Sequence, residues 1–217
     1  MNRRPVARPR RRLGDGHVLA VTEGLSTAAG VSLAEVLLGL GIAAVVATAA
    51  LPQLRAGLDE YRTRGATRYV AGRLQQTRME AVARSTNMAV RFTAAGASYT
   101  FVTLVDGDRD GVSSRDIQDG VDAPIGPIEA LSSRFPGVDF GMAPGLPSTD
   151  GTPLDGADPF RFGSSHMVSF TPLGTATAGS VYIRGRVGAQ YVVRVYGDTG
   201  KTQALRFDAR RGRWVPL

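Results

Sequence analysis

Three aspartates at alternate positions, Asp106, Asp108 and Asp110, stand directly before a glycine in the middle of the chain. Carboxylate oxygens at the first, third and fifth positions of a loop, followed by a glycine, are typical of the start of a calcium-binding loop. The closing acid of such a loop belongs at the position of Ile117, and Asp116 lies one residue before it. A calcium site formed by the three aspartates and Asp116 is one prediction, and a solvated hairpin turn is the alternative.

Basic residues gather at the C-terminal end of the chain and form a second candidate site. Their positive charge, which fits the backbone of a nucleic acid, comes from Lys201, Arg210, Arg211 and Arg213. Trp214 follows them and offers a ring on which a base can stack, although a tryptophan near a terminus more often seals the end of a core. DNA is therefore a candidate partner, and a solvated basic edge is the alternative interpretation.

Catalysis has little support in the sequence. Cysteine is absent, which excludes a cysteine nucleophile, a thiolate zinc site and a disulfide framework. The two histidines are His17 and His166, and His166 lies beside Ser164 and Ser165 without the spacing of a catalytic triad. We find no phosphate-binding loop, dinucleotide motif or zinc signature. We therefore expect a structural or binding protein and not an enzyme.

One carboxylate, Glu35, stands at the edge of a long apolar segment. Residues 36–54 carry no charge, and as a helix that rises about 1.5 Å per residue they match the ~30 Å thickness of a bilayer core. A carboxylate at that edge is costly in lipid unless it stays near the headgroups or meets a cation. The segment predicts a membrane anchor, and an ordinary signal anchor flanked by an acid is the simplest interpretation of Glu35.

The residues around Glu35 follow a more specific pattern. Gly30 precedes the apolar segment, Glu35 is the fifth residue after that glycine, and Pro52 is the twenty-second. This pattern resembles the N-terminus of type IV pilins and type II secretion pseudopilins, which usually have phenylalanine where Val31 stands. The resemblance implies that a prepilin peptidase cuts between Gly30 and Val31, that Val31 becomes the N-methylated first residue, and that Glu35 sets the register of assembly.

An assembled filament would give Glu35 a partner. The free α-amino group of Val31 on one subunit can neutralise Glu35 of a neighbour inside the apolar bundle, and a paired buried charge is far less costly than an isolated one. Pro52 removes one backbone hydrogen bond, which favours a kink or local melting of the helix. We therefore predict that Glu35 and Pro52 are determinants of assembly.

Six arginines precede the apolar segment, and they are Arg3, Arg4, Arg8, Arg10, Arg11 and Arg12. Arginines before a membrane segment stay on the cytoplasmic side, so we expect a cytoplasmic N-terminus and a globular domain outside the cytoplasm. Together with this orientation, the resemblance implies a single-pass protein of the bacterial inner membrane with a periplasmic globular domain. The resemblance implies that residues 1–30 are a leader peptide that the peptidase removes. A nucleic-acid-binding arm is the alternative interpretation of these arginines.

The helical pattern continues through residues 55–87, the expected amphipathic half of one long helix. The apolar stripe that we expect to pack on the domain consists of Leu54, Leu58, Tyr61, Gly65, Tyr69, Leu74, Thr77 and Ala81. Residues 77–92 resemble the junction between the helix and the first strand in the GspH/FimT group of minor pseudopilins. Independently, Met88, Val90 and Phe92 alternate with smaller or polar residues, as in a half-buried strand.

The rest of the chain predicts strands separated by turns. We expect strands within residues 98–105, 166–174, 180–184, 191–196 and 204–208. Residues 106–159 form a long loop, where the prolines and glycines of residues 121–159 make regular structure scarce apart from short apolar pieces at 125–131 and 135–140. The predicted fold class is α+β, in which a long N-terminal helix, transmembrane and then amphipathic, packs on an antiparallel β-sheet as in pilins.

The predicted organisation is a leader over residues 1–30, a transmembrane half-helix over 31–54, an amphipathic half-helix over 55–87 and a β-rich globular domain over 88–217. The function implied is that of a minor pilin or pseudopilin in a type IV pilus or a type II secretion pseudopilus. Its partners would be the prepilin peptidase, other pilins or pseudopilins and the inner membrane. A DNA-binding minor pilin for DNA uptake and a membrane-anchored calcium-binding domain are the alternatives.

Overall fold

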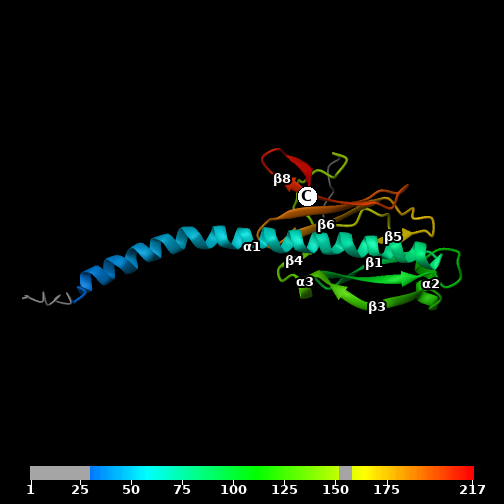
Figure 1. Cartoon of the computed structure of the whole chain (residues 1–217), viewed down its shortest axis with the longest axis horizontal. Coiled ribbons are helices and arrows are strands. Elements are labelled where there is room, and N and C mark those ends of the chain that lie inside the picture. The colour runs from blue at the N-terminus through cyan, green and yellow to red at the C-terminus, as the bar shows by residue number, and fades with distance from the viewer. Residues whose placement is uncertain (1–29, 152–157) are drawn as a thin grey trace, which may run out of the picture. The chain divides into compact units, whose positions relative to one another are not determined.

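The structure is a computed structural model that describes residues 30–151 and 158–217 (Figure 1). The predicted leader, apart from Gly30, and a short part of the predicted long loop lie outside the described residues. The chain forms two compact units, Met1–Ala44 and Val45–Leu217. The beginning of helix α1 belongs to the first unit, and the rest of that helix belongs to the second unit together with every described strand.

Helix α1 runs over Leu33–Arg84 and has 52 residues. Among the described residues it is the one helix that is long and apolar enough to cross a membrane, by length and composition. Pro52 lies inside the helix, which continues on both sides of it. The local melting expected at Pro52 therefore does not occur, because a proline removes only one of the many backbone hydrogen bonds of a long helix.

The helix ends before Asn87, the predicted limit, in a turn centred on Ser85. Ser85 has a φ of 51°. Its amide donates to the carbonyl of Val82 at 3.3 Å, and the amide of Thr86 donates to the carbonyl of Ala81 at 3.2 Å. This is the Schellman arrangement, in which a residue in the left-handed region lets the following amides satisfy the last helical carbonyls. The turn leads the chain directly into the first strand.

The buried face of α1 differs from the predicted stripe in its first half. Three residues of the stripe are exposed, namely Leu54, Leu58 and Tyr61. The buried positions are Asp59, Thr63, Ala66, Thr67, Val70, Leu74, Thr77 and Ala81. The cause is a close approach to strand β6 (Gly179–Gly185), where a β-carbon on Gly185 would collide with the side chains of Asp59 and Thr63. Only small or hydrogen-bonding residues fit there, and the stripe is correct from Leu74 onward.

Four antiparallel strands form the first sheet, in the order β3-β2-β1-β5. Their bounds are Met88–Ala95 for β1, Ser98–Val105 for β2, Ala123–Ala130 for β3 and Met167–Phe170 for β5. The hairpin β1–β2 closes where Ala95 pairs with Ser98, and the two strands that the sequence predicts here are confirmed. Strand β3 contains Pro124 and Pro127, and it lies at the edge of the sheet, where a strand tolerates proline.

Five antiparallel strands form the second sheet, in the order β4-β6-β7-β8-β9. Besides β6, they are β4 (Val138–Phe140), β7 (Gln190–Val195), β8 (Thr202–Asp208) and β9 (Arg213–Pro216). The predicted antiparallel arrangement is confirmed, with its strands divided between two sheets. Within residues 121–159, the predicted short apolar pieces at 125–131 and 135–140 contain most of β3 and all of β4, and the short helix α3 (Leu131–Arg134) lies between these two strands.

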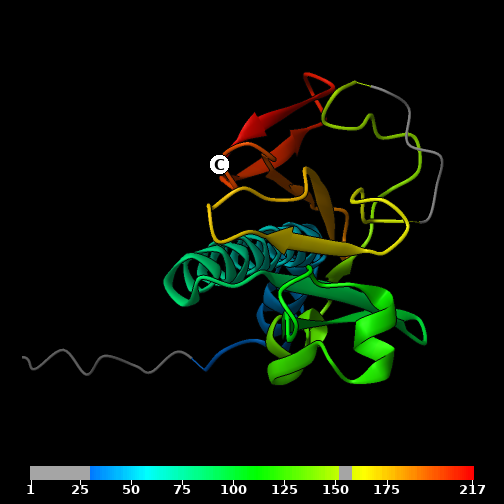
Figure 2. The same ribbon diagram turned by 90° about the vertical axis from the view of Figure 1, so that its right-hand side faces the viewer.

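An aromatic cluster joins the two sheets to α1. Phe92 of β1 stacks on Phe160 with ring centroids 4.5 Å apart, and it meets Phe140 of β4 edge-on at 5.2 Å. Tyr69 of α1 lies edge-on to Phe101 of β2 at 6.5 Å. In Figure 1 and Figure 2, β3 lies on one side of α1 and β8 on the other, so the helix segment after Val45 takes part in one core with both sheets.

Candidate functional site

The residues of the predicted processing and assembly site lie at the start of α1. Gly30 and Val31 precede the helix, and Glu35 occupies its first turn. Glu35 is exposed, and within residues 30–151 and 158–217 no hydrogen bond or ion pair involves its carboxylate. The helix dipole favours an acid in the first turn. It supplies only a partial positive charge, so a full counter-charge for Glu35 must come from another group.

The predicted metal ligands gather in one loop after β2. Carboxylate oxygens within 4.8 Å of one another belong to Asp106, Asp108 and Asp122. A second group that meets the same limit consists of Asp108, Asp110 and Asp116. The four predicted residues therefore lie in two groups that overlap at Asp108, and Asp122 joins one of them. Asp122 lies beyond Ile117, where a standard calcium loop would close, because the helix α2 (Ser114–Asp119), which carries Asp116, comes between.

Asp106 is buried and holds one end of this loop. Its carboxylate accepts hydrogen bonds from the side-chain amide of Asn87 at 2.7 Å and from the backbone amides of Arg109 at 2.6 Å and Gly111 at 3.0 Å. Burial alone would raise the pKa of Asp106, but these hydrogen bonds outweigh it and lower the pKa below its ordinary value. The ionised carboxylate of Asp106 therefore holds the backbone of the loop in place through these hydrogen bonds.

Asp122 is buried at the other end of the loop. It accepts hydrogen bonds from the backbone amides of Gly107 at 3.1 Å and Ser113 at 2.9 Å. Gly107 runs so close to the carbonyl of Val121 that a β-carbon at that position would collide with it. The two buried aspartates thus fix the shape of the loop, which fits a well-ordered turn as well as a metal site.

The exposed carboxylates lie between these two anchors. A hydrogen bond with Asp108 and the negative charge of Asp108 raise the pKa of Asp110, and the charge of Asp116 adds to the effect. Asp116 also accepts a hydrogen bond from the hydroxyl of Ser113, which caps α2. Crowded carboxylates repel one another, and a divalent cation would relieve that repulsion.

The structure does not gather the predicted nucleic-acid ligands at one place. Lys201 precedes β8, whereas Arg210 and Arg211 lie in the turn that follows it and Arg213 begins β9. Seven residues of extended strand separate the two ends, a distance of about 20 Å. Arg211 also lies 3.6 Å from the carboxylate of Asp208.

Trp214 is part of a small second core. Its indole NH donates to the carbonyl of Pro147 at 2.9 Å, and its ring lies edge-on to those of Tyr182 and Phe207. Of the two interpretations of this tryptophan, the sealing of a core is therefore correct. His166 has an equally structural environment, because its Nε2 lies 3.1 Å from Asp158 and its ring packs on Phe160.

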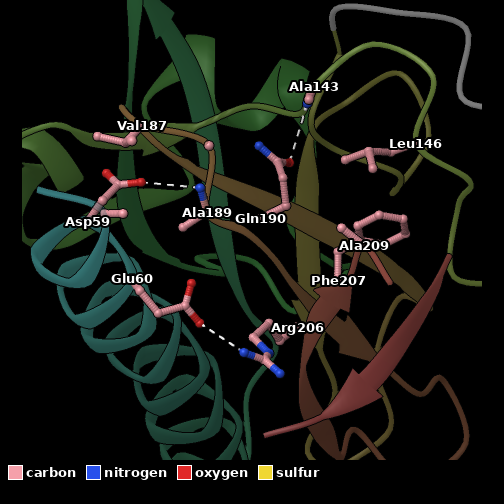
Figure 3. A pocket seen from close by; sticks show the side chains of 12 residues that line it. Asp59, Glu60, Ala143, Leu146, Val187, Ala189, Gln190, Arg206, Phe207 and Ala209 are labelled. Atoms are coloured by element: carbon pink, nitrogen blue, oxygen red, sulfur yellow. Dashed lines mark hydrogen bonds and ion pairs between the residues drawn. The ribbon is translucent and has the colours of Figure 1, made fainter. Parts of the chain in front are cut away.

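A pocket of about 420 Å³ lies between α1, β7 and β8 (Figure 3). Glu60 of α1 accepts a hydrogen bond from the hydroxyl of Tyr191 and lies 3.4 Å from Arg206. On the preceding residue, Asp59, one carboxylate oxygen accepts a hydrogen bond from the backbone amide of Ala189 at 3.2 Å. Burial, together with the hydrogen bond to Glu60, raises the pKa of Tyr191 far above its ordinary value.

Gln190 lines the same pocket and is buried. Its side-chain carbonyl accepts the amide of Ala143 at 3.3 Å, while its side-chain NH₂ has no partner among the described atoms. Sequence analysis missed this pocket because its walls come from three elements far apart in the chain. Its hydrogen bonds fasten α1 to the second sheet, which is a structural role.

Comparison with known proteins identifies a family for this chain. Residues 66–201 match the family model described as type II transport protein GspH. The chain is also similar in structure to the minor pseudopilin EpsH from the type 2 secretion system of Vibrio cholerae, with 13% identity and a TM-score of 0.43 over 67% of this chain and 97% of that one. No curated protein matches the sequence. Because the family match spans well over half of the chain, the protein belongs to the GspH family of type II transport proteins.

Proposed function

We propose that this protein is a structural, non-catalytic subunit of the type II secretion pseudopilus, held in the bacterial inner membrane by residues 36–54 until it is assembled. The observation that carries the proposal is the combination of the GspH match over residues 66–201 with a long helix whose exposed apolar part follows Glu35. The arginines before the apolar segment support a cytoplasmic N-terminus and a periplasmic β-domain. A type IV pilus is the less favoured setting, because the matching family is one of type II transport proteins.

Processing by a prepilin peptidase provides the first test. Mass spectrometry of the protein from its native membrane is expected to find N-methylated Val31 as the first residue. The physical reason is local: Gly30 has no side chain to block a protease, and it is exposed and lies outside regular structure before the first turn of α1. The variant Gly30→Leu is expected to keep its leader, and a matched change at Gly39 is expected to be cleaved normally. A first residue other than Val31 would contradict the proposed processing.

DNA binding is the weaker alternative for this scaffold. The basic residues named above lie at both ends of β8, and the ring of Trp214 is engaged by Tyr182 and Phe207. Some members of the FimT group that are linked to DNA uptake have a Gly-Arg-x-Arg motif near the C-terminus. The nearest equivalent in this chain is residues 200–203, where Lys201 and Gln203 stand in place of the two arginines. These features support a solvated basic edge, and we do not assign DNA binding to it.

Calcium is a proposed ligand of the acidic loop, residues 106–122, which has Asp106 at one end and Asp122 at the other. Asp108 is the residue to change, because it belongs to both carboxylate groups and is exposed, whereas Asp106 and Asp122 also hold the backbone. We expect millimolar calcium to raise the melting temperature of the protein by about 3–5 °C through a weak site. The variant Asp108→Asn is expected to lose this rise.

The measurement is thermal unfolding with and without calcium, supported by calorimetric titration. Asp198→Asn is the matched control, because Asp198 is an exposed acid in the turn between β7 and β8. It should retain the full response to calcium. An unchanged melting temperature in the wild-type protein would leave the loop as a solvated turn.

A further inference from the structure

A second hollow, of about 820 Å³, shares Asp59 and Val187 with the pocket in Figure 3. One wall is a face of α1, and the other is the turn between β6 and β7. Residues of the groove that matter here are Pro52, Arg55, Leu58, Arg62, Arg186 and Val187. Arg55 and Arg62 are seven residues apart, two turns of a helix, so they point to the same side of α1. We call this hollow the arginine groove.

The arginine groove carries free positive charge. Its three arginines are exposed. The side chain of Arg62 makes only a long hydrogen bond, 3.5 Å, to the carbonyl of Pro136. Within the described part of the chain, no hydrogen bond or ion pair involves the guanidinium group of Arg55 or Arg186. The one acid in the lining, Asp59, is buried and accepts the amide of Ala189. Three cations against one engaged anion make the groove a site for a negatively charged group.

Part of the groove is apolar, and this limits the kinds of anion that fit it. Leu58 is 44% exposed and Val187 is 58% exposed, and both line the hollow beside the arginines. A soluble phosphate or a DNA backbone would leave these two side chains in water. A molecule that carries a phosphate on a hydrocarbon chain would cover them and pair with the guanidinium groups, whose fork of NH donors matches phosphate oxygens.

The place of the groove in the sequence points to the same kind of molecule. Arg55 is the first charged residue after Glu35, and it directly follows the uncharged residues 36–54. Pro52, which still belongs to that uncharged stretch, lines the groove. If the stretch spans the bilayer, the groove opens where α1 leaves the hydrocarbon, which is the depth of the phosphate groups.

We propose that the arginine groove binds the headgroup of an anionic phospholipid. Arg55, Arg62 and Arg186 would hold the phosphate, and Leu58 and Val187 would cover the first part of the acyl chains. The inference rests on the proposed function in one respect, that residues 36–54 anchor the protein in a membrane. It assigns a lipid contact to the folded β-domain through Arg186, in addition to the insertion of the helix itself.

Native mass spectrometry of the full chain in a mild non-ionic detergent tests the proposal. With phosphatidylglycerol added, we expect a bound lipid that is retained in preference to phosphatidylcholine. The triple variant Arg55→Gln, Arg62→Gln, Arg186→Gln is expected to bind phosphatidylglycerol at least about tenfold more weakly. The triple control Arg64→Gln, Arg68→Gln, Arg161→Gln removes the same charge from exposed positions outside the groove and should bind as the wild type does.

Three results would overturn the lipid assignment. They are equal loss of phosphatidylglycerol in both triple variants, equal binding of the two lipids by the wild type, and displacement of the lipid by inorganic phosphate or by a short DNA duplex. Alkaline extraction of membranes separates this proposal from the proposed function. If alkaline extraction removes the chain from membranes, the proposed membrane anchor is wrong. If the chain stays in the membrane but its groove variants bind phosphatidylglycerol as the wild type does, only the lipid assignment is wrong.

Discussion

Replacing Glu35 by alanine is expected to abolish the incorporation of this protein into the pseudopilus while leaving its β-domain folded. Glu35 lies in the first turn of α1, exposed, and without a counter-charge from the described part of its own chain. In a bundle of apolar helices its partner would be the α-amino group of Val31 on a neighbouring subunit. Removing one member of a buried ion pair leaves the other uncompensated, which costs about 3–5 kcal/mol.

That cost corresponds to a loss of more than about 100-fold in the affinity of a subunit for the filament. The measurement is the amount of protein that cross-links to and copurifies with the other pseudopilins, relative to its amount in the membrane. Glu35→Asp keeps the charge and is expected to retain part of the incorporation. Glu80→Ala is the matched control on the same helix, because Glu80 pairs only weakly with Arg84 at 4.0 Å, outside the apolar segment. Normal incorporation of Glu35→Ala would contradict the proposed assembly.

Local patterns in the sequence predict much of this fold. The alternation of Met88, Val90 and Phe92 predicts β1, and residues 98–105 coincide with β2. These predictions succeed because a hairpin is decided by neighbouring residues and by the turn between them. The length and composition of the helix are likewise local properties, and the structure has it at the predicted place, ending at Arg84.

Long-range contacts explain the predictions that fail. The sequence favours large apolar side chains for the buried face of α1, yet Asp59 and Thr63 are buried because Gly185, more than 100 residues later, lies against them. The division into two sheets also depends on pairings between distant strands. Neither property leaves a periodic signal.

In the acidic loop, the sequence identifies some of the aspartates that come together and misses Asp122. Spacing alone identifies Asp106, Asp108 and Asp110 as a group. In the structure the carboxylate of Asp108 lies close to that of Asp106 and, in a second group, to those of Asp110 and Asp116. Asp122 joins them only because α2 returns the chain to the start of the loop, where Asp122 accepts the amide of Gly107. A ligand contributed after a helical turn has no fixed spacing, so sequence analysis does not find it.

Replacing Phe92 by alanine is expected to cost about 3–5 kcal/mol of the free energy of unfolding. Phe92 is 2% exposed, and its ring contacts Phe160 and Phe140 at centroid distances of 4.5 Å and 5.2 Å. Phe140 belongs to β4 of the second sheet, and Phe160 forms a bridge to Val181 of β6. The cavity would therefore open where the two sheets meet, and no single strand can shift to fill it.

Urea unfolding of the full chain in detergent micelles measures this loss, with the fluorescence of Trp214, the single tryptophan, as the probe. Leu173→Ala is the control, since Leu173 is 90% exposed and its removal should change the free energy of unfolding by less than about 0.5 kcal/mol. Phe92→Leu keeps most of the volume and should fall between the two. A loss below about 1 kcal/mol for Phe92→Ala would mean that the sheets are joined elsewhere. Because a pseudopilus subunit must present one rigid surface to its neighbours, the same variant is expected to be incorporated less well than Leu173→Ala.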